Sequence, residues 1–143
     1  MKSIFLTESP YRKQARFIAI VWTLLIFVGC FYPSRELPRV AIPLIDKWTH
    51  FVLFGGFSFL WLCAYPDYTF RSLVLLFIVY LLLGSFIEVM QGQLTMLGRS
   101  MELMDAVADT VGGVLGTSVF CSASYFAGKV KSEKAKINSA SGR

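Results

Sequence analysis

The chain has 143 residues, of which 55% are hydrophobic and only 16% are charged, and its mean hydropathy is +0.59. Soluble domains carry about 25% charged residues, so this composition excludes an ordinary soluble domain and indicates a polytopic membrane protein with one domain. The net charge of +5 is concentrated in the two terminal segments, which we interpret as a topology signal and not as a nucleic-acid-binding surface.

The first predicted span follows a basic N-terminal segment. Residues 1–16 contain four cations and one acid, whereas residues 17–34 carry no charge. A helix of 18 residues extends about 27 Å, close to the thickness of a bilayer core. This segment is either a retained helix or a signal peptide, and lipoprotein-type cleavage before Cys30 is a weaker alternative.

Three further spans are predicted at residues 48–65, 72–87 and 110–128. Three prolines in residues 33–47 exclude a regular helix there and predict a loop along the membrane surface. Residues 66–68 form a tight turn, and residues 92–104 a loop. The tail, residues 129–143, carries four lysines by Lys136 and is predicted to be disordered. The fold class is therefore an all-α integral membrane protein with four transmembrane helices in residues 17–128.

The basic termini predict the orientation. An even number of spans places both termini on one side, and an excess of Lys and Arg marks the cytoplasmic side. The loops 33–47 and 92–104 then face outward. Apart from Arg71, each ionisable residue that enters a span enters it from this outer leaflet. Because ionisable groups are costly in lipid, we interpret them as a functional site.

Two short motifs carry candidate site residues on the second and third spans. Asp46 and His50 are four residues apart, with Lys47 beside them, and would share one helix face if the helix begins by Asp46. Ser85, Glu88 and Gln91 repeat every three residues along the third span. The alternatives are an interfacial His, an Asp that complements a helix start, and a Glu that reaches the interface.

The fourth span carries the remaining candidates. Asp105 and Asp109 share one face with Gly112 and Gly116, and a small-xxx-small pair lets a second helix approach closely. Arg99 would be a counter-ion for these acids or a clamp on a phosphate or carboxylate. The alternatives are a solvated Arg99 and acids, such as Glu102 and Asp105, that complement the helix dipole.

In order, these motifs resemble the VanZ-like family over residues 44–120. They are Asp46-Lys47-x-x-His50, Gly84-x-x-x-Glu88-x-x-Gln91 and Gly98-Arg99-Ser100-x-Glu102-x-x-Asp105-x-x-x-Asp109-x-x-Gly112-x-x-x-Gly116. The family pattern usually has Asn where this chain has Asp109. The resemblance implies a small multi-pass protein of the bacterial cytoplasmic membrane, and the founding member is associated with low-level teicoplanin resistance. It supplies no reaction.

The first functional hypothesis is a site at the outer leaflet. His50, Glu88, Asp105 and Asp109 would form an acid/base or metal-binding cluster. Contacts to an anionic lipid headgroup or a lipid-linked cell-envelope precursor would come from Asp46, Lys47, Ser85, Gln91 and Arg99. The cofactor is open. One His among carboxylates suits magnesium, manganese or calcium better than zinc. The three cysteines lack zinc spacing. No nucleophile stands out, so the sequence leaves open whether the protein is an enzyme.

The second hypothesis is a non-enzymatic membrane module whose polar residues hold the helices together while it binds lipid or another protein. A proton-coupled transporter is a third, although four spans are few for one unless the protein dimerises. Membrane lipids are the expected partners, and a homo-oligomer is left open.

Overall fold

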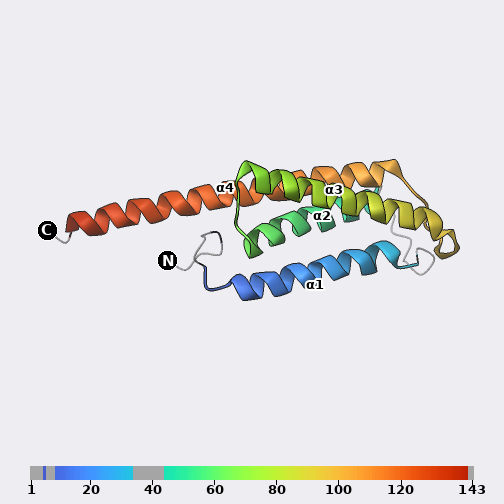
Figure 1. The fold of residues 1–143 in the computed structure, drawn as a ribbon, viewed down its shortest axis with the longest axis horizontal. Helices are drawn as coiled ribbons and strands as arrows, with labels where there is room; N and C mark the ends of the chain where they lie inside the picture. The colour runs from blue at the N-terminus through green and yellow to red at the C-terminus, as the bar shows by residue number, and fades with distance from the viewer. Residues whose placement is uncertain (1–4, 6–8, 34–43, 142–143) are drawn as a thin grey trace.

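The computed structural model describes residue 5, residues 9–33 and residues 44–141, and these residues form an all-helical fold. The helices are α1 (Arg12–Phe31), α2 (Ile45–Ala64), α3 (Phe70–Gln93) and α4 (Leu103–Ser141), with the short 3-10 helix η2 (Thr95–Leu97) between α3 and α4. Consecutive α-helices run in opposite directions and pack as a bundle (Figure 1). The all-α fold predicted from the sequence is confirmed.

Three of the described helices, α1, α3 and α4, are long and apolar enough to cross a membrane. α2 has 20 residues but does not meet this criterion, because Asp46, Lys47 and His50 lie in its first two turns. α2 packs against α1 and most extensively against α4. Much of its surface therefore faces other helices, and such a surface need not be apolar.

The helix bounds differ from the predicted spans, and the difference matters at the polar residues. α2 begins at Ile45 and α3 continues to Gln93, so the candidate residues at both places lie within helices. The predicted surface loop, residues 33–47, falls mostly outside the described residues. Its last three positions belong to α2.

The prediction of a disordered tail is wrong as far as Ser141, since α4 continues as a helix to that residue. Residues 129–141 contain four lysines, a glutamate and two alanines, all good helix formers, and they extend a helix that is already nucleated. In Figure 1 this part of α4 (red) projects beyond the bundle as a single helix. It projects at the end of the bundle where α1 begins.

α2 and α4 approach each other closely through glycines. A Cβ atom on Gly112 would collide with the carbonyl oxygen of Phe51, and one on Gly116 with that of Gly55. Across the same interface, Ser58 Oγ donates a 2.8 Å hydrogen bond to the carbonyl oxygen of Gly113. The small-residue packing face that the sequence predicted on this helix is confirmed.

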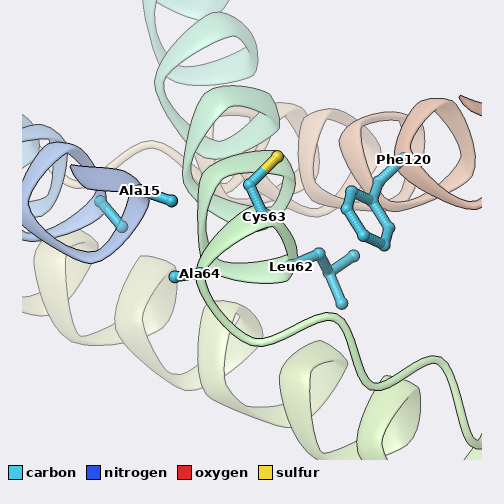
Figure 2. Packing of buried hydrophobic residues seen from close by; sticks show 6 residues of the cluster. Ala15, Leu62, Cys63, Ala64 and Phe120 are labelled. Atoms are coloured by element: carbon cyan, nitrogen blue, oxygen red, sulfur yellow. The ribbon is translucent and has the colours of Figure 1, made fainter. Parts of the chain in front are cut away.

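The end of the bundle where α2 turns into α3 has an apolar interior. Its buried core combines four small residues with two large apolar side chains: Ala15, Ala19, Cys63 and Ala64 with Leu62 and Phe120. Figure 2 shows Leu62 and Cys63 of α2 beside Phe120 of α4. We call this region the apolar end. Cys63 is a free, buried thiol that packs there as a small hydrophobe.

The turn that leads into α3 is held by side-chain hydrogen bonds. Ser72 Oγ donates to Asp67 Oδ2 at 2.7 Å, and the backbone N–H of Thr69 donates to Asp67 Oδ1 at 3.0 Å. These donors, with Ser72 the largest contribution, hold the pKa of Asp67 below its usual value. Thr69 caps the first turn of α3 by accepting from the N–H of Ser72.

Candidate functional site

Buried ionisable side chains gather at the opposite end of the bundle, which we call the polar end. The alternating helix directions bring the start of α2, the end of α3 and the start of α4 together there, beside the α3–α4 loop (Figure 1). Each helix contributes to the cluster: His50 from α2, Glu88 from α3, and Asp105 and Asp109 from α4. All four residues are at most 2% exposed.

His50 links the carboxyl groups of the two other helices. Its Nδ1 lies 3.0 Å from Asp109 Oδ1, within hydrogen-bond distance, and 4.0 Å from Glu88 Oε1. The second oxygen of Glu88, Oε2, accepts a 2.9 Å hydrogen bond from the backbone N–H of Glu102. This bond ties the end of α3 to the residue just before α4.

Three buried oxygens at this end, Glu88 Oε1, Asp109 Oδ2 and Gln91 Oε1, have no hydrogen-bond partner among the residues that the structure describes. Asp109 Oδ2 occupies space that a side chain at position 84 would otherwise fill. A Cβ atom on Gly84 would lie 2.7 Å from it. Unpartnered buried polar atoms are rare and costly, so this arrangement calls for an additional proton or ligand.

Lys47 is the counter-ion of the acids at the start of α4. Its Nζ lies 2.6 Å from Glu102 Oε2 and 3.1 Å from Asp105 Oδ1. The Lys47 side chain is 24% exposed and that of Glu102 is 47% exposed. This pair therefore forms part of the accessible rim, whereas Asp105 lies beneath it.

The prediction that Arg99 neutralises the acids of the fourth span is wrong. Its guanidinium donates to the carbonyl oxygens of Gly29 (3.0 Å) and Tyr32 (3.1 Å), and its ion-pair partner is Asp46 at 3.3 Å. The carbonyl groups at a helix C-terminus lack partners within the helix, and Arg99 binds that of Gly29 in the last turn of α1 and that of the C-cap residue Tyr32. It fastens the end of α1 to the start of α2.

On α3, the predicted three-residue stripe is only partly correct. Gln91 is buried, and its Nε2 donates a 2.8 Å hydrogen bond to the carbonyl oxygen of Cys30. Ser85 is exposed and does not join the cluster. Steps of three residues drift around a helix of 3.6 residues per turn, so the buried face instead passes through Gly84, Glu88 and Gln91.

Asp46 and His50, which the sequence predicted to pair with each other, have other partners. Asp46 binds Arg99 of the α3–α4 loop, and His50 Nδ1 faces Asp109 of α4. Even so, Asp46, His50 and Asp105 have potential ligand atoms within 4.8 Å of one another, as do His50, Glu88 and Asp109. The polar end thus contains two overlapping groups of side chains that could hold a metal ion.

Sequence reasoning missed the contacts made by the backbone. The carbonyl groups of Gly29, Cys30 and Tyr32 and the N–H of Glu102 all bind site side chains. Every residue has such groups, so no residue type marks them. The role of Lys47 as counter-ion had a visible signal, because a lysine within the Asp46-Lys47-x-x-His50 motif enters the same helix turn as the site.

A groove lies on another side of the bundle, lined by α1, α2 and α3. Its volume is about 740 Å³, and it extends along α3 from Ser72 to Phe86 with Phe27 of α1 on its opposite wall. That stretch of helix is about 21 Å long, more than the roughly 15 Å of hydrocarbon in one leaflet. Its lining is almost entirely apolar.

No family model matches the chain, and neither the curated proteins nor the solved structures include a detectable match. The site therefore has to be interpreted from its own chemistry. Among the described residues there, five carboxyl groups face two permanent cations, Lys47 and Arg99. A buried His held by carboxyl groups can act in proton transfer or as a metal ligand.

Proposed function

We propose that this protein is a VanZ-like membrane protein that binds or processes an anionic lipid headgroup, or a lipid-linked cell-envelope precursor, at the outer leaflet of the bacterial cytoplasmic membrane. The observation that carries this proposal is the concentration of buried His50, Glu88, Asp105 and Asp109 at one end of an otherwise apolar bundle. Scattered polar residues would favour a structural role, whereas one cluster favours a site.

The proposal includes four membrane spans with both termini in the cytoplasm. In this proposal α2 also crosses the membrane, in addition to α1, α3 and α4, and its neighbouring helices shield it from lipid. The charge distribution supports the orientation: Arg12, Lys13 and Arg16 of α1 and the lysines of residues 129–141 of α4, which we call the α4 extension, lie toward the apolar end. The positive-inside rule assigns that end to the cytoplasm, so the polar end would face outward.

A lipid would approach the site from the membrane plane. Lys47 and Glu102 form the accessible rim, while the apolar groove between α1 and α3 would accommodate an acyl chain. The end of the groove nearest the polar end is at Phe27. Phe27 lies within one helical turn of Cys30, whose carbonyl oxygen accepts a hydrogen bond from Gln91. Headgroup and chain would thus bind to neighbouring parts of the same bundle.

A second candidate, a non-enzymatic module, is favoured by a different observation. The polar side chains join helices in pairs, through His50–Asp109, Gln91–Cys30 and Arg99–Gly29. Hydrogen bonds between membrane helices contribute about 0.6 kcal/mol each on average. The cluster would then hold the bundle together while the protein binds lipid or a partner.

The lipid-directed site and the non-enzymatic module can be distinguished by measuring the teicoplanin susceptibility of a Gram-positive host that expresses the protein. We expect the wild type to lower susceptibility, and Glu88→Gln or Asp109→Asn to abolish the effect at unchanged membrane abundance. Glu133→Gln, an exposed acid on the α4 extension, is the matched control and should behave as wild type. Loss of abundance together with the effect would favour the structural module. A full effect in both variants would refute a site at these residues.

A further inference from the structure

We propose that His50, Glu88 and Asp109 bind one divalent cation of the magnesium, manganese and calcium class. Their ligand atoms lie within 4.8 Å of one another. Oxygen ligands bind these cations at about 2.0–2.6 Å, so two ligands of one ion lie at most about 5 Å apart. The three side chains, which come from three helices, already meet this condition.

The unpartnered oxygens are the second observation that points to a ligand. Glu88 and Asp109 are each 1% exposed, and each has one buried oxygen, Oε1 and Oδ2 respectively, without a hydrogen-bond partner in the described part of the chain. Gly84 leaves room for Asp109 Oδ2 beside α3. If a buried carboxylate only held helices together, we would expect both of its oxygens to have hydrogen-bond partners.

The distribution of charge favours His50, Glu88 and Asp109 as the cation site over the overlapping group of Asp46, His50 and Asp105. Asp105 and Asp46 are already paired with Lys47 and Arg99, and these cations would repel a metal ion. Within the described part of the chain, neither Glu88 nor Asp109 has a Lys or Arg ion-pair partner. Two buried carboxylates with a neutral imidazole carry a charge of −2, which a divalent cation balances.

The donor set favours a hard cation. Two carboxylates suit magnesium, manganese and calcium, while a single imidazole falls short of the usual zinc set. To bind through Nδ1, His50 must carry its proton on the other ring nitrogen. The proton that His50 Nδ1 shares with Asp109 in the ion-free protein would move to that other nitrogen, so the cation takes its place without a change in the number of bound protons.

A bound cation would explain how the proposed site attracts an anionic headgroup, but the cation site can exist without that function. Lys47 and Arg99, the two Lys or Arg residues at this end among those that the structure describes, are already paired with acids of the chain, so these two offer little free positive charge to an anionic headgroup. A bound divalent ion would supply that charge, as metal ions do for phosphate groups. The test below uses the metal alone, without lipid, so the cation site can fail while the teicoplanin effect persists, and the reverse.

Titration of the purified full-length protein in detergent with Mn²⁺, followed by the EPR signal of free Mn²⁺, tests the proposal. We expect one Mn²⁺ bound per chain, displaced by Mg²⁺ or Ca²⁺ in excess. Glu88→Gln and Asp109→Asn should each weaken binding about tenfold or more, and Glu133→Gln should not change it. Absence of a stoichiometric site, or equal binding by both site variants, would overturn the proposal.

A second variant guards against misfolding of the first two. Gly84→Ala keeps every ligand but places a methyl group against Asp109 Oδ2. It should weaken Mn²⁺ binding, whereas Gly128→Ala, where a Cβ meets nothing within 4 Å, should leave it unchanged. Thermal melting without metal is recorded for each variant. Loss of Mn²⁺ binding in Asp105→Asn but not in Asp109→Asn would place the cation elsewhere and overturn the assignment.

Discussion

At the apolar end of the bundle the interior is made of Ala15, Leu62 and Phe120, whereas at the polar end it is made of His50, Glu88 and Asp109. Both interiors are closed, and all six residues are at most 3% exposed. Their chemistry is opposite: aromatic rings lie 5.9–6.2 Å apart around Phe120, and carboxyl groups surround an imidazole at the other end. Packing alone accounts for the first interior but not for the second.

The difference indicates where the molecule gains stability and where it gives some up. Close packing of apolar side chains supports the helix bundle at the apolar end. Among the described residues, three buried oxygens at the polar end have no partner, two of them on carboxyl groups, whereas the unpartnered oxygens farther along α4 are the hydroxyls of Thr117 and Ser124; buried groups without partners cost free energy, and charged ones cost the most. Ionisable residues that lower the stability of a membrane protein in this way commonly bind a ligand or take part in a reaction.

The membrane orientation gives an all-or-none difference between the ends. Ser100 lies in the α3–α4 loop at the polar end, and Ser132 on the α4 extension, and both are exposed. A membrane-impermeant thiol reagent should label Ser100→Cys in intact cells and Ser132→Cys only after lysis. Wild type measures the background from the native cysteines. The opposite pattern would reverse the proposed topology and place the polar end in the cytoplasm.

Removing the ring of Phe120 should cause the largest loss of stability among single changes at either end. Phe120 is fully buried, and Phe→Ala changes in close-packed cores cost about 3–5 kcal/mol. Unfolding of Phe120→Ala in detergent, compared with Val119→Ala on the exposed side of the same turn, measures the cost. Mn²⁺ binding by the folded fraction should stay unchanged, because the cavity forms at the far end.

Gln91→Leu should have a smaller effect, below about 1 kcal/mol. The change removes one hydrogen bond to the carbonyl oxygen of Cys30, but it also removes the unpartnered Gln91 Oε1. Gln93→Leu, at an exposed position of the same helix, is the matched control in the same unfolding assay. A loss as large as that of Phe120→Ala would show that the polar end holds the bundle together, and would favour the structural module.

Parts of the site could be predicted because they depend on one helix at a time. Asp105, Asp109, Gly112 and Gly116 share a face whatever that face meets, and the structure places Asp105 and Asp109 in the buried cluster and both glycines against α2. Ser85 failed because two three-residue steps rotate it away from the face of Gln91. The error lay in the helical periodicity that was used, not in the choice of helix.

The pairing of charges could not be predicted in the same way. Whether Asp105 binds Arg99 or Lys47 depends on how α2 and the α3–α4 loop are rotated against α4. Local sequence does not fix that rotation. In the structure Lys47 instead of Arg99 binds Asp105, and Arg99 binds the carbonyl groups of Gly29 and Tyr32 at the end of α1. Backbone partners of this kind have no side-chain signature in any sequence.

The sequence by itself determined that the chain forms apolar helices and that its ionisable residues enter them near the same ends, because composition and helical period are local properties. Only the tertiary structure decided that α2 is the inner helix and that His50 joins Asp109 and Glu88. Those choices depend on distances of a few ångströms between separate helices, which follow from the packing of the whole bundle.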